Sequence, residues 1–177
     1  MMDLRAEFAG TIHLPDKRFV YPGSPVYLPD GHLIALIAWR TWSGQFSVLD
    51  SSGKTIASGR PRGVFRRRYT VLAVNGSPVL DVLPGAFGPL GRMEVTLGSG
   101  RQITVRRSSM WSSRRFEFYA ANNRVAGRIG PTARLFSFHP DSYAFDLMMP
   151  VMSALEAIAL AQALRVMARA IRTVAAS

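Results

Sequence analysis

Arginines that lie beside aromatic residues are the side chains with the clearest potential for chemistry. One group includes Arg60 and Arg62 and surrounds Phe65 and Tyr69, and a second group surrounds Trp111. Guanidinium groups bind phosphates and carboxylates through paired hydrogen bonds, so clustered arginines suit lipid headgroups or backbone phosphates. The candidate anion- or lipid-binding residues are Arg66, Arg67, Arg68, Arg106, Arg107, Arg114 and Arg115. The competing interpretation is that these side chains are solubilising charge on the outer surface of the fold.

The charge of the whole chain agrees with an anionic partner without identifying it. There are 22 Lys and Arg against 11 Asp and Glu, which gives a formal net charge of +11. Such an excess favours nucleic acid, anionic lipid or acidic proteins. Because Lys17 and Lys54 are the only lysines, the excess is almost entirely arginine. Selection for planar, bidentate recognition would produce this pattern, and so would a coding bias of the source genome.

Catalytic and metal-binding patterns are weak in this sequence. The absence of cysteine excludes disulfides, thiolate metal sites and cysteine nucleophiles. His13, His32 and His139 are far apart and lack the spacing of a helical metal motif. The segment from Gly85 to Gly91 does not end in the Lys-Ser/Thr of a phosphate-binding loop, and no nucleophile elbow frames the serines between 108 and 113. We therefore predict a protein that is not an enzyme and that uses no metal and no cofactor.

Short apolar runs separated by Gly, Pro, Asn and Ser predict a β-rich fold, and a length of 177 residues suits one domain. If the segment that contains Arg66 is a strand, alternation places Arg66 and Arg68 on one face and Tyr69 on the other. Proline and glycine interrupt residues 1–32, so we expect an extended arm there, followed by the folded domain at 33–177. The predicted strands are 33–41, 46–50, 55–59, 65–74, 79–83, 92–97, 102–107, 115–119, 124–129, 134–139 and 143–147.

A weak internal repeat links two of the predicted hairpins. The segment from Trp42 to Ala57 and the segment from Trp111 to Ala126 each contain a tryptophan, a strand, a turn and a strand. The alignment requires gaps, so it suggests two related halves. The residues from Tyr69 to Leu80 predict a further hairpin with an Asn-Gly turn.

A single long helix is predicted after Pro150. Ser153 and Glu156 have the spacing of a capping box, so the helix should begin within a residue or two of Ala154. Leu155 to Leu164 is apolar on most faces, which predicts a helix enclosed by the fold. A membrane span is disfavoured because acidic, amide and arginine side chains fall within the same stretch; each central arginine would cost about 2.5 to 3.5 kcal/mol.

Three arginines follow the apolar part of this helix. Arg165, Arg169 and Arg172 are spaced i, i+4 and i+7, so they form one stripe over the last turns. We expect the helix to leave the core there and the stripe to be solvated. The alternative is a secondary anion-binding surface.

The order of these features resembles the tubby C-terminal-like superfamily, which includes the phospholipid scramblase and LURP-one-related families. The resemblance lies in the hairpins 46–57 and 116–126 and in a last strand, 141–147, that leads into the helix. It implies a closed antiparallel β-barrel of about twelve strands that encloses the C-terminal helix. The acidic residue that often precedes the helix in the family is missing, and so is the calcium-binding cluster of animal scramblases. The resemblance therefore does not carry lipid scrambling over to this chain.

The leading functional hypothesis is a non-enzymatic barrel that binds membrane lipid headgroups. One alternative is a nucleic-acid-binding protein with Trp111 and Tyr69 as stacking residues. Another is a structural subunit or homo-oligomer in which the arm 1–32 docks on a neighbour. Asp3, Arg5 and Glu7 interrupt any secretory signal, so we expect a cytoplasmic protein that can be peripheral to a membrane.

Overall fold

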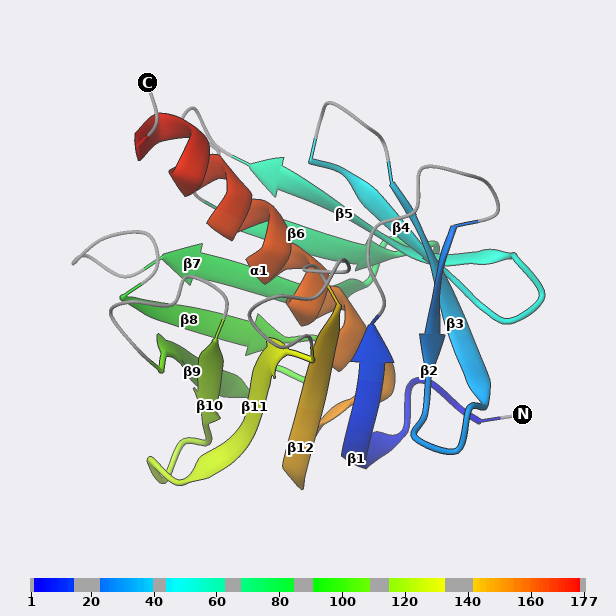
Figure 1. Cartoon of the computed structure of the whole chain (residues 1–177), viewed down its shortest axis with the longest axis horizontal. Helices are drawn as coiled ribbons and strands as arrows, with labels where there is room; N and C mark the ends of the chain where they lie inside the picture. Colours follow the sequence, from blue (N-terminus) through cyan, green and yellow to red (C-terminus); the bar gives the residue numbers. More distant parts are fainter. Residues whose placement is uncertain are drawn as a thin grey trace.

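A computed structural model describes residues 2–14, 23–39, 44–62, 68–84, 91–108, 115–132 and 142–175, with side chains in the final helix described as far as Ala168. Twelve antiparallel strands in this part of the chain close into a barrel around one helix, α1 (Figure 1). The strands are β1 (Glu7–Leu14), β2 (Ser24–Tyr27), β3 (Leu33–Trp39), β4 (Phe46–Leu49), β5 (Thr55–Arg62), β6 (Arg68–Ala73), β7 (Pro78–Pro84), β8 (Arg92–Leu97), β9 (Gln102–Arg107), β10 (Phe116–Tyr119), β11 (Val125–Pro131) and β12 (Tyr143–Ser153); α1 spans Ala154–Ala175. The predicted fold class is confirmed.

The barrel wall follows from the alternation of side chains along each strand, which directs every second residue inward. Aligned across four neighbouring strands, Ile12, Phe145, Ile129 and Phe116 are register partners, and all four are buried. The same alternation turns polar residues outward. The wall therefore separates a mainly apolar interior from a more polar outer surface.

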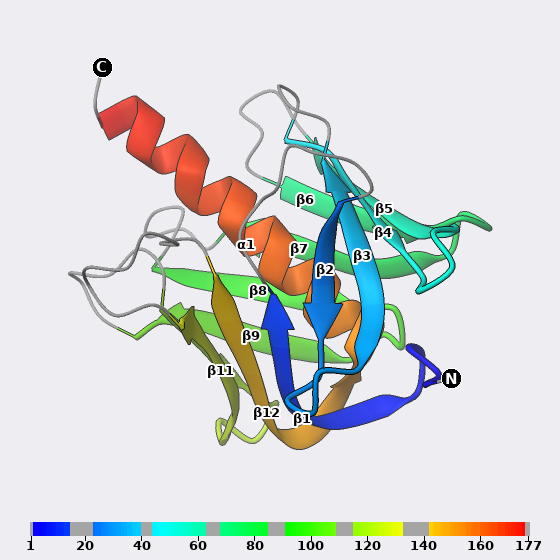
Figure 2. The ribbon, with the colours of Figure 1, turned by 45° about the vertical axis from the view of Figure 1, so that its right-hand side comes forward.

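Consecutive strands are neighbours, so tight turns and longer connections fall at opposite ends of the barrel. At the turn end, Gly53 and Asn123 adopt positive φ angles of 86° and 58°, which close the β4–β5 and β10–β11 hairpins. Helix α1 begins at this turn end, and its last turns project past the strands at the other end (Figure 2). We call that other end the loop end.

The N-terminal residues are not an arm outside the barrel. Strand β1 pairs with β12 along its length and also contacts β2, so it closes the barrel. Strand β2 pairs with β3 even though Pro25 lies within it. The prediction of an arm at 1–32 is wrong for these residues. Strand β1 was missed because it is irregular. A register shift between Phe8 and Gly10 hides the alternation that a strand normally shows.

Most other strand predictions are confirmed, with differences at the strand ends; β5, for example, continues to Arg62, beyond the predicted end at residue 59. Strand β12 continues through Pro150 to Ser153, beyond the predicted end at Leu147. The predicted strand 134–139 lies outside the described residues. The hairpin predicted from Tyr69 to Leu80 is confirmed as β6–β7, and Gly76 in its turn has a φ of 83°.

The capping box of α1 is present. The hydroxyl of Ser153 accepts a hydrogen bond from the Glu156 backbone N–H at 3.2 Å, and the Glu156 carboxylate accepts from the Ser153 N–H at 2.7 Å. Leu155 to Leu164 is buried, as predicted. Among the described residues, no helix is both long and apolar enough to cross a membrane.

The helix does not leave the core where the sequence suggested. Arg165 is only 7% exposed, and its guanidinium lies 5.1 Å from the centre of the Tyr143 ring. Burial continues to Ala168. The expected solvated stripe is therefore wrong at Arg165, because an aromatic face takes the place of water. The side chains of Arg169 and Arg172 lie outside the described residues.

The predicted internal repeat has a structural counterpart. Phe46 opposes Gly59 in the β4–β5 hairpin, and Phe116 opposes Ile129 in the β10–β11 hairpin, with each residue 70 positions after its counterpart. The register shifts at the same place in both hairpins. The two hairpins can therefore be aligned without a gap from the phenylalanine to the last paired residue. The two tryptophans of the predicted repeat lie outside the described residues.

This correspondence extends one strand to each side. Pro61 opposes Tyr69 across β5 and β6, and Pro131 opposes Tyr143 across β11 and β12. On the other side, β3 and β9 have equivalent pairings with β4 and β10. The strands β3–β6 and β9–β12 are therefore related segments of the wall.

Candidate functional site

The predicted arginine clusters lie apart on the barrel. Arg68 begins β6, whereas Arg106 and Arg107 end β9 and Arg115 precedes β10. All four are on strand segments nearest the loop end, but β6 and β9 are separated by two other strands. Arg66, Arg67 and Arg114 lie outside the described residues. The arginines that the structure describes therefore form two groups instead of one continuous patch.

Two of the predicted residues are engaged within the fold. The Arg68 Nε donates to both carboxylate oxygens of Asp81, at 2.9 and 2.8 Å, and this hydrogen bonding raises the pKa of Arg68. The Arg106 guanidinium lies 4.6 Å from the centre of the Tyr119 ring and donates to Asn123 Oδ1 at 3.3 Å. Neither side chain is a freely available anion receptor.

Other arginines have no anionic partner among the described residues. They include Arg60 and Arg62 on β5, Arg107 at the end of β9, and Arg115 before β10. Arg60, Arg62 and Arg115 are exposed, and Arg107 is half-buried. Arg62 also lies directly opposite Arg68 across the β5–β6 ladder, where like charges repel. Asp81 neutralises Arg68, so Arg62 is the member of this pair that has no anionic partner among the described residues.

Arg60 borders a hollow of about 700 Å³ on the outer face of strands β3 to β6, which we call the β3–β6 hollow. Ser47, Ser58 and Thr70 face outward into it from three adjacent strands. The Ser47 and Ser58 hydroxyls are 3.3 Å apart, and the Thr70 hydroxyl donates to Asp81 at 2.8 Å. The hollow thus presents hydroxyl groups beside one guanidinium that has no anionic partner.

The inner wall behind this hollow is tightly packed. The rings of Phe46 and Tyr69 stack with centroids 5.8 Å apart, and a Cβ at Gly59 would come within 2.6 Å of the Phe46 ring. Tyr69 is fully buried, its hydroxyl donates to the Gly44 carbonyl, and burial raises its pKa. The inward orientation of Tyr69 and the outward orientation of Arg68 agree with the predicted alternation. They also prevent Tyr69 from stacking on a nucleic-acid base.

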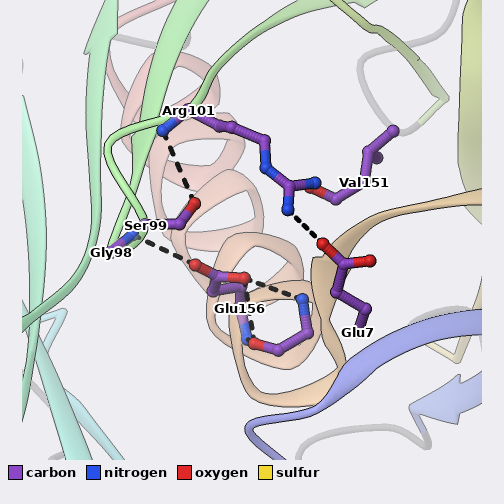
Figure 3. A network of polar contacts seen from close by, with 7 residues as sticks. Glu7, Gly98, Ser99, Arg101, Val151 and Glu156 are labelled. Carbon is purple, nitrogen blue, oxygen red and sulfur yellow. Dashed lines mark hydrogen bonds and ion pairs between the residues drawn. The ribbon is translucent and has the colours of Figure 1, made fainter.

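A polar network closes the turn end of the barrel (Figure 3). In addition to capping α1, Glu156 accepts from the Gly98 N–H at 3.0 Å. Arg101 pairs with Glu7, which raises the Arg101 pKa, and donates to the Val151 carbonyl at 3.3 Å. A cavity of about 320 Å³ borders these residues. Both Glu156 oxygens accept hydrogen bonds, and the network joins β1, β12 and the β8–β9 turn to the start of α1.

Histidines and carboxylates do not converge in the part of the chain that the structure describes. His13 lies on β1 and His32 lies next to a turn, while His139 is outside the described residues. No three His, Asp or Glu side chains of the described ranges are grouped so that they could hold a metal ion.

The sequence places Arg60 in the first arginine group, but Arg60 was not among the candidate binding residues, and the hydroxyl groups beside it were missed. Ser47, Ser58 and Thr70 are adjacent only because of the register of β4, β5 and β6. The sequence does indicate which residues of each predicted strand alternate towards the outer face. This alternation does not determine the register between neighbouring strands. In the β4–β5 pair the register shifts after Val48.

Comparison with known proteins gives a likeness of fold. No protein-family model matches this chain, and no curated protein sequence matches it. Among solved structures, the chain is similar to the X-ray structure of a protein from Arabidopsis thaliana, AT5G01750, with a TM-score of 0.55 and 14% sequence identity. The match covers 96% of this chain and 94% of the Arabidopsis chain. At this identity the likeness shows that the two proteins share a fold over almost their whole length.

Proposed function

We propose that this chain is a tubby C-terminal-like barrel protein of the LURP-one-related or phospholipid scramblase type, and that it binds an anionic headgroup without catalysing a reaction. The support is the order of the elements: twelve strands in a closed barrel, with the last strand leading directly into an enclosed helix. The fold shared with the Arabidopsis protein agrees with this assignment.

The single observation that carries the proposal is Arg60 in the β3–β6 hollow. Its guanidinium has no anionic partner among the described residues, and Ser47 and Ser58 border the same hollow; their hydroxyls share one hydrogen bond, so one O–H remains able to donate, whereas the Thr70 hydroxyl donates to Asp81. A phosphate accepts hydrogen bonds from both kinds of donor, and a guanidinium supplies them in pairs. A phosphate-bearing headgroup therefore fits this hollow better than an apolar ligand does.

Neighbouring charge strengthens the site. Arg62 lies one outward position further along β5 towards the loop end and has no anionic partner among the described residues, whereas Arg68 opposite it is paired with Asp81. The net charge of +11 would steer the protein towards an anionic membrane surface. We infer a cytoplasmic protein that associates with membranes peripherally.

Co-sedimentation with vesicles tests this function. Wild-type protein should bind phosphatidylcholine vesicles that contain phosphatidylserine at physiological salt, and should bind pure phosphatidylcholine poorly. Each basic residue near an anionic surface contributes about 1 kcal/mol, so the double variant Arg60→Gln/Arg62→Gln should bind roughly tenfold to thirtyfold more weakly.

The matched control is Lys54→Gln/Arg124→Gln, which removes the same charge from exposed positions at the turn end. Binding should remain within about twofold of wild type, since these side chains lie far from the hollow. Equal losses of vesicle binding in both double variants would show that binding depends on net charge and not on the β3–β6 hollow. Equally poor binding to both kinds of vesicle would refute the proposal.

Nucleic acid is the less favoured partner. Tyr69, one of the two stacking residues that this alternative requires, is fully buried, and Trp111 lies outside the described residues. A salt-dependent gel shift with single-stranded and duplex DNA would reverse this preference if wild-type protein bound DNA more tightly than anionic vesicles.

A further inference from the structure

A second hollow of about 410 Å³ occupies the equivalent place in the other half of the barrel wall, on β9 to β12. We call it the β9–β12 hollow. Because the two wall segments share their pairing, residues can be matched between them through the register. Arg115 precedes Phe116 as Gln45 precedes Phe46, and Asp146 occupies the position on β12 that Leu72 has on β6. The same location therefore carries a different set of charges.

The floor of the β9–β12 hollow is formed by two small residues. Gly130 and Ala144 are register partners at the positions equivalent to Arg60 and Thr70. A Cβ at Gly130 would have the Arg115 Cγ as its nearest neighbour, at 3.7 Å, which is ordinary contact. Packing does not demand a glycine here, in contrast to Gly59. The space above Gly130 is thus available to a ligand.

The charges around this floor are only partly neutralised. Arg128 lies 3.3 Å from Glu117, and Glu117 also accepts from the Tyr119 hydroxyl at 2.7 Å. Asp146 accepts one hydrogen bond, from Thr11 at 2.7 Å, and forms no ion pair within the described residues. Arg115 has no anionic partner there either. One cation and one anion at the edge of the hollow therefore retain binding capacity.

Arg115 and Asp146 lie on opposite sides of β11: Arg115 is level with Gly130, and Asp146 is the register partner of Arg128 two residues away. Arg115 is next to β10 and Asp146 is on β12, so two strand spacings of about 4.8 Å separate them laterally. Both side chains border the hollow. A ligand between them would meet a guanidinium at one end and a carboxylate at the other.

We propose that the β9–β12 hollow binds a small zwitterion, with its phosphate or carboxylate on Arg115 and its primary ammonium on Asp146. The ethanolamine phosphodiester group has this chemistry, both as a free compound and as a lipid headgroup. This site is separate from the Arg60 site, and the two are expected to select different headgroups.

Isothermal titration calorimetry with three soluble phosphodiesters tests the proposal. Glycerophosphoethanolamine carries a primary ammonium, glycerophosphocholine a quaternary one without N–H donors, and glycerophosphoglycerol none. Wild-type protein should bind glycerophosphoethanolamine at least roughly tenfold more tightly than the other two, because only its ammonium can donate charge-assisted hydrogen bonds to Asp146. Equal affinities, or no measurable binding of any of the three, would overturn the proposal.

Two variants assign the two ends of the ligand. Arg115→Gln introduces the residue found at the equivalent Gln45 and should weaken glycerophosphoethanolamine binding about tenfold or more. Asp146→Asn keeps an acceptor for Thr11 and should abolish the preference over glycerophosphoglycerol. Unchanged affinity and selectivity in both variants would contradict the assignment, and thermal melting would confirm that each variant is folded.

Vesicles distinguish the source of the ligand and separate the two proposals. If the headgroup is bound on a membrane, phosphatidylethanolamine vesicles should retain wild-type protein better than phosphatidylcholine vesicles; a difference seen only with the free compound assigns a soluble ligand. Arg60→Gln should leave glycerophosphoethanolamine affinity unchanged. A loss of that affinity in Arg60→Gln would refute a separate site, whereas failure of anionic-vesicle binding alone would leave the zwitterion site intact.

Discussion

At the scale of single residues, several arginines of the barrel are held by side chains that are distant in the sequence: Asp81 binds Arg68, and Tyr143 lies against Arg165. Arg68 was recognisable as a candidate, but its engagement by Asp81 depends on the pairing of β6 with β7. Arg165 was expected in water and instead packs against Tyr143, a residue 22 positions earlier in the chain. Partners brought together by tertiary structure decide which arginines are available, and a linear pattern of charge does not contain them.

Gln162 offers a prediction at this scale. It is fully buried in α1, and neither of its amide atoms has a hydrogen-bond partner among the residues that the structure describes. An unsatisfied buried polar group costs about 1 to 3 kcal/mol, so Gln162→Met should raise the free energy of unfolding by about that amount in a urea denaturation experiment.

Leu160→Gln, which places the same amide elsewhere on the buried helix, is the matched control and should destabilise the protein. A destabilised Gln162→Met variant would show that the amide has a favourable role in the interior, such as binding an internal water molecule.

At the scale of elements, helices and hairpins that have a local sequence signal were predicted well, and irregular strands were predicted poorly. The start of α1 was predictable because its capping box lies within four residues, Ser153 to Glu156. The hairpins were predictable because their turns require residues such as Gly53 and Asn123 that tolerate positive φ. Strand β1 was missed because its first half is largely exposed and its register shifts, so its pairing with β12 has no local signature.

The β4–β5 turn gives a pH-dependent prediction. The Asp50 carboxylate accepts from the Ser52 hydroxyl at 2.6 Å and from the Lys54 N–H at 3.0 Å. These hydrogen bonds, with that of the Ser52 hydroxyl contributing most, lower the Asp50 pKa from its ordinary value of 3.8. A lowered pKa in the folded state means that the stabilisation is complete above pH 3.8 and is lost as pH falls through the folded-state pKa.

The melting temperature of Asp50→Asn should therefore be below that of wild type near pH 6, and the difference should shrink as the pH falls below about 4. Asn122, two residues before Arg124 in the equivalent turn, accepts from the Arg124 N–H at 3.1 Å and does not titrate. Asn122→Ala should lower the melting temperature by the same amount across this range. If the difference in melting temperature between Asp50→Asn and wild type did not depend on pH, the Asp50 charge would not be what stabilises the turn.

At the scale of the whole molecule, closure of the barrel joins its first strand to its last. The barrel closes through β1, which lies between β12 and β2, and the Leu4 carbonyl accepts from the Leu155 N–H at 2.8 Å. The family resemblance led to the correct barrel class, but it gave no reason to assign the closing strand to residues 7–14. The repeat relation of β3–β6 to β9–β12 is likewise a property of the assembled wall, and it is what reveals the two unequal hollows.

Ile12 tests whether the N-terminal segment is structural in this sense. It is fully buried on β1, opposite Phe145 on β12, so Ile12→Ala should lower the free energy of unfolding by about 2 to 5 kcal/mol in chemical denaturation. The adjacent His13 faces outward, and His13→Ala should change stability by less than about 1 kcal/mol. An arm that only docks on another molecule would make both variants neutral in the monomer. A large effect at Ile12 alone would instead establish that the segment closes the wall on which both proposed headgroup sites depend.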